Sequence, residues 1–418
     1  MAKITKIIGR EILDSRAIPT VEAIVVLDDN SVGSFAVPSG ISVGKHEAVE
    51  LRDKDTKRFS GNGVLKALTN IHTILTPLLI GKDAQNQLEI DKLMIDADGS
   101  ENKANLGANS ILALSGAVAR AQASSQNLSL YRYIAKLSEK DTNQQHLIPT
   151  PMVNILNGGK HGGGNVDFQE FLIVPPKSNS YSKNLQICTE IYYSLKETII
   201  AHSGIPLIGD EGGYSPTLYS NADAFKILEE AVSKSGYNLG VDVFFSIDVA
   251  ASNLLSGSGY KIKDKPIAMN AADFIDYFVA LNEQYHLLSI EDAVSEDDWN
   301  SWQVLTEKLG ESVLIVGDDL ITTNMNRLKK AIDKKACNAI IIKPNQVGTV
   351  TETIEVIKEA VKNNLKIIVS HRSGETNDDF IADFAVGVGA DYMKLGAPAR
   401  GERVAKYNRL LEIEHEIS

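Results

Sequence analysis

The chain has 418 residues, which is too long for one ordinary domain and predicts two or three, one of which could be a β/α barrel of about 250 residues. Apolar residues make up 43% and charged residues 23% of the sequence, so a disordered or fibrous chain is excluded. The formal net charge of −12 argues against nonspecific binding of nucleic acid or of an anionic membrane, although local charge could still bind a small anion.

The sequence contains no signal for a membrane or for export. No apolar run approaches the roughly 18 residues of a membrane span, and the first ten residues lack the apolar core of a signal peptide. Cys188 and Cys337 have no Cys or His at metal-site spacing, so we expect buried thiols in a reducing compartment. We therefore predict a cytoplasmic enzyme that binds neither nucleic acid nor a membrane.

The first third of the chain mixes strand and helix patterns. Residues 20–27 and 32–37 are rich in β-branched residues and flank the turn sequence Asp-Asp-Asn, which predicts a hairpin. Three helical patterns follow, near residues 63–80, 86–97 and 107–125, and the last is rich in small residues that allow close packing. A polar stretch at 138–145 predicts a domain boundary, with an α+β domain at 1–138 and a larger domain at 139–418.

The second part of the chain repeats one unit, in which a short apolar run ends in a charged residue and a helical pattern follows. The residues that end these runs are Asp248, Glu291, Asp318, Lys343, His371 and Lys394. Continuous apolar runs separated by helices predict parallel strands that are buried on both faces. Six units in sequence favour a closed barrel over the alternative, an open doubly wound sheet. In a barrel the six residues would meet at one mouth, where barrel enzymes carry their active sites.

Three of these residues are carboxylates, Asp248, Glu291 and Asp318. Any one of them could be a solvated loop charge, but two carboxylates about 4 Å apart repel by roughly 4 kcal/mol at an effective dielectric constant of 20. Protonation or a bound cation must relieve that repulsion. Three oxygen ligands suit a hard cation, and Mg²⁺ is the expected one.

Basic residues end the next strands. A free lysine has a pKa of about 10.4, and a neighbouring cation lowers it. Lys343 could therefore act as a base, with Lys394 and a metal nearby; the alternative is that both lysines are ordinary salt-bridge partners of the carboxylates. His371, Arg372 and Ser373 place a guanidinium and a hydroxyl in one stretch, which suits a phosphate, although a lone loop arginine is common.

Earlier segments contain further candidates. The glycine-rich residues 157–164 could bring His161 and their own backbone close to a ligand. Gln169 and Glu170 precede an apolar run, and GDEGG (209–213) places Glu211 in a tight turn. GISVGK (40–45) looks like a phosphate-binding P-loop, but it is one residue short and is followed by His46 instead of Ser or Thr, so it is rejected.

Taken together, these motifs resemble the enolases. The segments that carry the resemblance are GDEGG (209–213), DVAAS (248–252), SIED (289–292), GDDL (317–320), KPNQVGT (343–349), SHRSGET (370–376) and AKYN (405–408). They follow the family order from about residue 8 to the end of the chain. The resemblance implies a small N-terminal α+β domain and an eight-stranded β/α barrel of the enolase type, whose first units are irregular and include one antiparallel strand.

The resemblance also implies a reaction, the reversible dehydration of 2-phospho-D-glycerate to phosphoenolpyruvate in glycolysis and gluconeogenesis. A lysine base, a glutamate acid and two Mg²⁺ ions that stabilise an enediolate intermediate would carry it out. The partner implied is a small phosphorylated substrate, and the family is usually dimeric and sometimes octameric.

Transferred residue by residue, Lys343 would remove the C2 proton and Glu211 would protonate the departing hydroxyl, supported by Glu170. The first Mg²⁺ would be held by Asp248, Glu291 and Asp318, and the second, bound with substrate, by Ser42 in a mobile lid loop at 39–46. Substrate contacts would come from His161, Gln169, Glu170, Glu291, Asp318, His371, Arg372, Ser373 and Lys394, of which Arg372 and Ser373 hold the phosphate and Lys394 the carboxylate end.

The sequence departs from the family pattern at six positions, Ala17, Ile18, Ile41, Val43, Asn253 and Leu395. None of them is a catalytic side chain, so we expect an active enzyme whose second Mg²⁺ binds weakly. Two other readings remain open here. A related enzyme that acts on a sugar acid would not need Arg372 and Ser373, and a binding protein descended from an enolase would have the fold without turnover.

Overall fold

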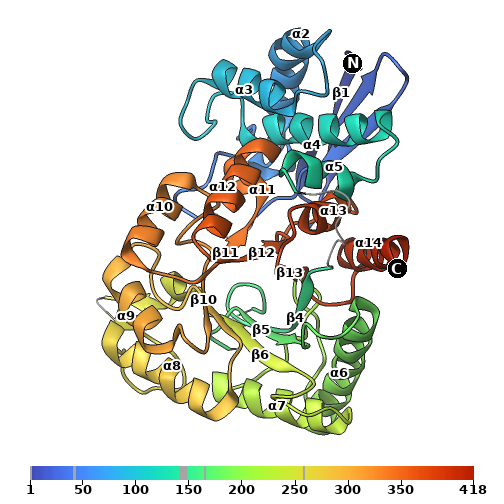
Figure 1. Cartoon of the computed structure of the whole chain (residues 1–418). Helices are drawn as coiled ribbons and strands as arrows, with labels where there is room; N and C mark the ends of the chain where they lie inside the picture. Colours follow the sequence, from blue (N-terminus) through green and yellow to red (C-terminus); the bar gives the residue numbers. More distant parts are fainter. Residues whose placement is uncertain (1, 41–43, 141–147, 164–165, 258) are drawn as a thin grey trace.

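The structure, a computed structural model, describes residues 2–40, 44–140, 148–163, 166–257 and 259–418. A sheet with helices forms the N-terminal part, and a barrel surrounded by helices forms the rest (Figure 1). The domain boundary predicted at 138–145 falls largely outside the described residues and stays a prediction.

The N-terminal sheet has three antiparallel strands in the order β1 (Ile4–Leu13), β2 (Pro19–Leu27) and β3 (Val32–Ala36). The predicted hairpin is β2–β3, while β1 was not predicted, because charged and half-exposed residues interrupt its apolar pattern. A short 3₁₀ turn (Phe59–Gly61) precedes the helices. The predicted helix near 63–80 is α1 (Leu65–Asn70), a π-helical turn (Ile71–Leu75) and α2 (Thr76–Leu79) in succession.

Three further helices complete this part, α3 (Gln87–Asp98), α4 (Ala108–Ser125) and α5 (Leu130–Leu137). The first two match the predicted patterns, and α5 was not predicted. Helix α4 is almost wholly buried against β2 and β3, as its small residues suggested. A Cβ on Gly116 would lie 2.6 Å from the Phe35 ring, so the helix could not come this close to the sheet with a larger residue there.

The second part is a closed barrel of eight strands in the order β10-β11-β12-β13-β4-β5-β6-β9, which confirms the barrel over the open sheet. The strands are β4 (Thr150–Asn157), β5 (Glu170–Val174), β6 (Phe244–Asp248), β9 (Ser289–Glu291), β10 (Leu314–Gly317), β11 (Ala339–Ile342), β12 (Lys366–Ser370) and β13 (Tyr392–Lys394). Strand β5 runs antiparallel to both of its neighbours, and the other pairs are parallel, as the resemblance implied.

Helices surround the barrel on its outside (Figure 1). They are α6 (Tyr181–Ala201), α7 (Asn221–Lys234), α8 (Ala271–Tyr285), α9 (Trp299–Leu309), α10 (Met325–Lys334), α11 (Pro344–Val347), α12 (Val350–Lys362), α13 (Phe380–Gly387) and α14 (Gly401–Ile417). A 3₁₀ turn (Ala251–Leu254) and the two-residue strands β7 (Leu255–Ser256) and β8 (Gly259–Tyr260) follow β6.

The core has two parts. Most apolar side chains pack between the strands and the surrounding helices, and a second cluster fills the barrel itself, with Met152, Leu172, Val174, Val316, Ala339, Ile341, Ile368 and Tyr392. The interior is therefore a packed core and not a pore. It leaves the carboxyl ends of the parallel strands as the place where polar side chains can gather.

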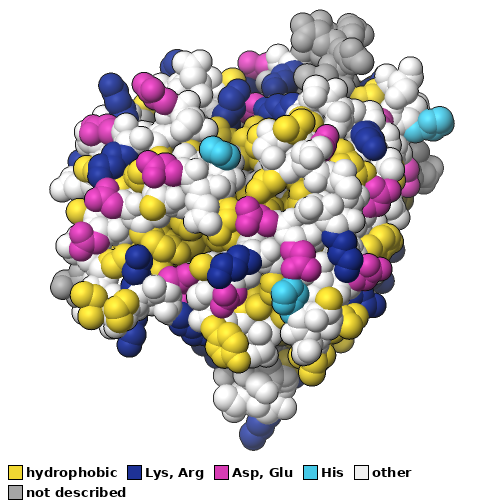
Figure 2. Space-filling model, turned by 90° about the horizontal axis from the view of Figure 1, so that it is seen from below, with side chains coloured by type: hydrophobic (Ala, Val, Ile, Leu, Met, Phe, Trp, Pro, Cys, Tyr) yellow, Lys and Arg dark blue, Asp and Glu magenta, His cyan; other side chains and the backbone are white. Residues whose placement is uncertain are grey.

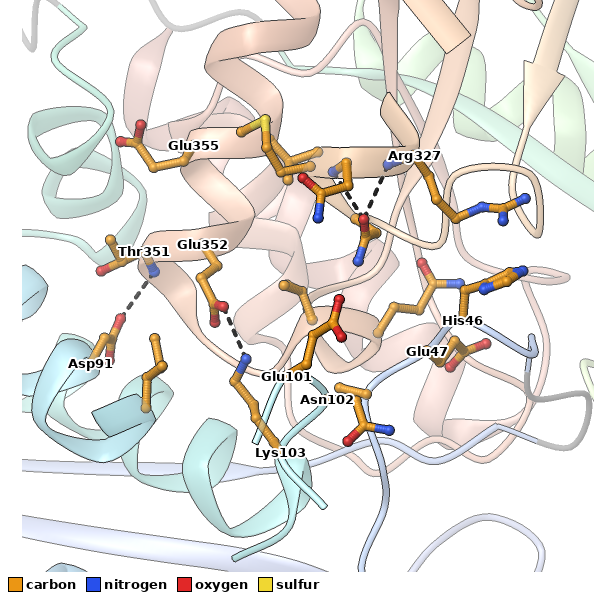
Figure 3. A pocket seen from close by; sticks show the side chains of 18 of the residues that line it. His46, Glu47, Asp91, Glu101, Asn102, Lys103, Arg327, Thr351, Glu352 and Glu355 are labelled. Carbon is orange, nitrogen blue, oxygen red and sulfur yellow. Dashed lines mark hydrogen bonds and ion pairs between the residues drawn. The ribbon is translucent and has the colours of Figure 1, made fainter. Parts of the chain in front are cut away.

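The N-terminal part docks on the barrel through buried polar contacts. Asp91 of α3 accepts a hydrogen bond from the backbone nitrogen of Thr351 on α12 (3.0 Å), and Lys103 Nζ lies 2.9 Å from Glu352 Oε1. Figure 3 shows both pairs beside the cleft between the two parts, with His46 and Glu47 at its other end. Residues 45–48 line this cleft beside the barrel.

Among the described residues, no helix has the length and apolar character needed to cross a membrane. The face shown in Figure 2, which lies at the bottom of Figure 1, carries acidic and basic side chains side by side. That face presents no large field of one sign.

The turn between β1 and β2 carries a strained residue. Ala17 has φ 59°, in the left-handed region, at a position where the enolase pattern has glycine. We expect Ala17→Gly to raise the free energy of unfolding by about 0.5–1 kcal/mol, because relief of the strain exceeds the extra chain entropy that glycine loses. Thermal or urea unfolding measures it.

Asn30→Gly is the matched control for Ala17→Gly. Asn30 also has a positive φ, 68°, in the turn between β2 and β3, but asparagine tolerates this conformation. Asn30→Gly should therefore change the free energy of unfolding by only about a few tenths of a kcal/mol. Equal effects of the two substitutions would show that Ala17 is not strained.

Candidate active site

The six residues predicted to end the strands do converge on one mouth of the barrel. Asp248, Glu291 and Lys394 are the last residues of β6, β9 and β13. Asp318, Lys343 and His371 each follow a strand by one residue. A polar cavity opens there, lined by His161, Gln169, Glu170, Glu211, Asp248, Asn253, Asp292, Asp318, Asp319, Lys343, Ser370, His371, Arg372, Ser373 and Lys394.

Lys394 lies at the centre of the carboxylates. Its Nζ is 2.9 Å from Glu291 Oε2, 3.2 Å from Asp248 Oδ2 and 3.0 Å from Glu170 Oε2. Burial alone would lower the pKa of Lys394, but these carboxylates outweigh burial and raise the pKa well above its usual value. Burial and then the neighbouring Asp248 raise the pKa of Glu291 well above its ordinary value. One cation therefore does not balance the negative charge gathered here.

Lys343 forms an ion pair with Asp318, whose other oxygen accepts a hydrogen bond from Gln346 Nε2 (3.1 Å). Burial lowers the pKa of Lys343, but Asp318 more than compensates and raises it. Burial raises the pKa of Asp318, and Lys343 overcomes this and lowers it. In this arrangement both lysines are charged salt-bridge partners, which was the alternative left open by the sequence. The arrangement does not favour the neutral form that a base needs.

A second group of titratable residues gathers around His161. Its Nδ1 lies 3.5 Å from Glu170 Oε1 and 3.4 Å from Glu211 Oε2. Burial raises the pKa of Glu170 to about 7. Burial would also raise the pKa of Glu211, but His161 and then His371 outweigh it and lower the pKa well below the usual range. Burial would lower the pKa of His161, but Glu211 and Glu170 outweigh it and raise the pKa to about 10, so the imidazole holds a proton beside the two carboxyl groups. The three groups therefore share their protons.

Glu211 is placed by a turn that only glycines permit. A Cβ on Gly209 would lie 2.6 Å from the His161 carbonyl oxygen, and one on Gly213 would lie 2.6 Å from Asn157 Oδ1. The turn therefore packs directly on the segment after β4 and brings Glu211 beside His161. Asn154 Nδ2 donates to Glu211 Oε2 (3.1 Å) and fixes the carboxylate.

Arg372 and Ser373 line the cavity just beyond β12. Arg372 Nη1 donates to Glu47 Oε2 and to Asn345 Oδ1, both at 2.8 Å. Burial lowers the pKa of Arg372, and Glu47 more than offsets it, so the guanidinium is fully charged. Arg403 holds the backbone of this segment, because its guanidinium donates hydrogen bonds to the carbonyl oxygens of Arg372 and Ser373, both at 2.6 Å.

Two buried polar atoms in the cavity point to a ligand. His161 Nε2 and Gln169 Oε1 are buried and have no hydrogen-bond partner among the described residues. Buried polar groups in native proteins are almost always paired with protein, water or a ligand. A polar substrate is therefore a suitable occupant of this cavity.

The structure brings together all the predicted site residues that it describes. Ser42, together with Ile41 and Val43, lies outside the described residues, so its assignment to a second metal stays a prediction. Sequence reasoning missed Glu47, Asn154 and Arg403, which hold other site residues in place. Glu47 and Arg372 are 325 residues apart, and no local pattern could have paired them.

Comparison with known protein families agrees with this arrangement. A model described as "Enolase, N-terminal domain" matches residues 4–134, and one described as "Enolase, C-terminal TIM barrel domain" matches residues 145–418.

Proposed function

The chain belongs to the enolase family, and from that premise we propose which of its residues carry out the family's reaction, the dehydration of 2-phospho-D-glycerate to phosphoenolpyruvate in glycolysis. The enzyme is a lyase, phosphopyruvate hydratase. The residue roles below are supported by the geometry of the barrel mouth.

The observation that carries the proposal is the position of two strands. In the barrel order, β11 and β5 are four strands apart in a ring of eight, so they face each other across the mouth. Lys343 follows β11, and Glu170 begins β5 with Glu211 close by through His161. A base and an acid on opposite walls can remove the C2 proton from one side of the substrate and protonate the C3 hydroxyl from the other.

We assign the base to Lys343 and the acid to Glu211, with Glu170 supplying the shared proton. The ion pair with Asp318 stabilises the ammonium form of Lys343. Lys343 would therefore act as a base once another cation replaces it as the partner of Asp318. Glu211, whose low pKa leaves it ionised, would take its proton from the protonated His161, whose Nδ1 lies 3.4 Å away. Glu170, 3.5 Å from the same Nδ1, would then return a proton to His161.

The carboxylates Asp248, Glu291 and Asp318 suit a divalent metal. They stand on or just after three adjacent strands, β6, β9 and β10, and the first two already converge on the Lys394 ammonium. Buried, mutually repelling oxygen ligands with no sulfur favour a hard cation, so we propose Mg²⁺. When bound, Mg²⁺ would neutralise the charge that builds up on the substrate carboxylate as the proton leaves. A second Mg²⁺, held by Ser42, rests on the family resemblance.

Removing divalent cations should abolish turnover. We expect EDTA to lower the rate of phosphoenolpyruvate formation by at least about a thousandfold, because metal charge stabilisation is worth several kcal/mol, and excess Mg²⁺ should restore the rate. Ultraviolet absorbance of the enol product measures both steps. An undiminished rate in EDTA, with metal removal verified by elemental analysis, would rule out a metal at these carboxylates.

The remaining site residues would bind the substrate. Arg372 and Ser373 suit the phosphate, and Lys394 suits the carboxylate end, because each presents cationic or hydroxyl donors to the cavity. His161, Gln169 and His371 complete its wall. Dependence on the phosphate distinguishes this reaction from dehydration of a plain sugar acid.

The oligomeric state is also a proposal. The family resemblance suggests a homodimer or homo-octamer, and exposed large apolar side chains, Leu13, Ile205, Leu207 and Ile208, provide surface that such an assembly could cover.

A further inference from the structure

Glu47 holds the guanidinium of Arg372 in a buried, two-pronged ion pair. Its Oε2 lies 2.8 Å from Nη1 and its Oε1 lies 3.2 Å from Nη2. Both side chains are only 4% exposed. Asn345 Oδ1 accepts a third hydrogen bond from Nη1 (2.8 Å), so the terminal nitrogens are fixed from two elements.

The same carboxylate also fixes the chain that precedes it. Glu47 Oε1 accepts a hydrogen bond from the backbone nitrogen of Gly44 (2.8 Å). On the other side, Gly40 lies directly against the guanidinium, since a Cβ there would be 2.1 Å from Arg372 Nη2. Glu47 and Gly40 therefore confine the guanidinium from two sides, and Arg372 lines the cavity.

A carboxylate at this position has two opposite effects on a phosphate. Its negative charge repels the phosphate, which would make Glu47 a competitor for Arg372. Its two acceptors also hold a long, flexible side chain in one conformation before the ligand arrives, and this removes an ordering cost from binding. The two effects predict opposite changes when the charge is removed, so they can be separated.

We propose that Glu47 is a positioning residue of the active site, which orients Arg372 toward the substrate phosphate. The inference rests on the proposed role of Arg372 as the phosphate ligand. The fork geometry supports orientation over competition, because Glu47 engages both terminal nitrogens at once while Arg372 still lines the cavity.

The test is competitive inhibition by inorganic phosphate at saturating Mg²⁺. We expect Glu47→Gln to raise the inhibition constant about ten- to hundredfold, because an amide has one acceptor and cannot hold the fork. The KM for 2-phosphoglycerate should rise in parallel. Arg372→Lys should give at least as large an increase.

The matched control is Glu11→Gln. Glu11 accepts the same kind of fork from Arg58 and also a backbone hydrogen bond, from Val64 (3.0 Å), but it lies in the N-terminal sheet away from the cavity. We expect stability to fall with this change and phosphate inhibition to stay within about twofold of the wild type. An effect of Glu47→Gln no larger than that of Glu11→Gln would overturn the inference.

Tighter phosphate inhibition in Glu47→Gln would also overturn it, by showing that Glu47 competes with the ligand. If Arg372→Lys leaves the inhibition constant unchanged, the phosphate role of Arg372 itself fails, and the inference falls with it. Should Glu47→Gln not fold, Gly40→Ala is a second way to displace the guanidinium, because its Cβ would collide with Arg372 Nη2. An unchanged inhibition constant in a folded Gly40→Ala variant would likewise contradict the proposal.

Discussion

Lys343→Ala is expected to lower the rate of 2-phosphoglycerate dehydration by about 10⁴-fold, the upper end of what a positioned acid or base contributes. Lys343 follows β11, lines the cavity, and lies across the mouth from Glu170 and Glu211. Its removal takes away the group assigned to remove the C2 proton. Steady-state formation of phosphoenolpyruvate measures the loss.

Lys366→Ala is the control for this substitution. Lys366 begins β12, near the opposite end of the barrel from the mouth, and lies 3.2 Å from Asp391 Oδ1. The change removes a barrel lysine and an ion pair but leaves the mouth intact, so the rate should stay within about twofold of wild type. A similar loss in both variants would mean that the effect of Lys343→Ala reflects general damage to the barrel.

Glu211→Gln should lower dehydration by about 10²- to 10⁴-fold for a different reason. The amide keeps the size of the side chain and can still accept the hydrogen bond from Asn154, but it cannot protonate the departing hydroxyl. Enzyme titrated with 2-phosphoglycerate by calorimetry should still bind it. Glu170→Gln should have a smaller effect; if it alone stops the reaction, the two glutamates have exchanged roles.

The sequence predicted the barrel and most of the mouth because the relevant signals are local. Each apolar run of the repeat ended at a charged residue, and in parallel strands those ends share one edge. Even β9, only three residues long, was found through Glu291. Strand β1 and helix α5 were missed because one alternates irregularly and the other spans only eight residues.

What the sequence could not predict was the pairing of distant side chains. The ion pair of Arg372 with Glu47 depends on the docked N-terminal part and had no signal in the sequence. The ion pair of Lys343 with Asp318 was only one of two alternatives, and which carboxylate the lysine meets depends on the closed barrel. The expectation of a neutral Lys343 assumed that a neighbouring metal ion lowers its pKa. In the structure its neighbour is the ionised carboxylate of Asp318, which raises the pKa instead. The direction of a pKa shift follows from such contacts and not from spacing along the chain.

Exchange of the C2 proton with deuterated solvent, followed by NMR of 2-phosphoglycerate, tests the division of labour between the two walls most directly. Exchange reports proton removal even when the hydroxyl does not leave. We predict that Glu211→Gln retains exchange while losing dehydration, and that Lys343→Ala loses both. Exchange at the wild-type rate in Lys343→Ala, together with its loss in Glu211→Gln, would contradict the assignment of base and acid.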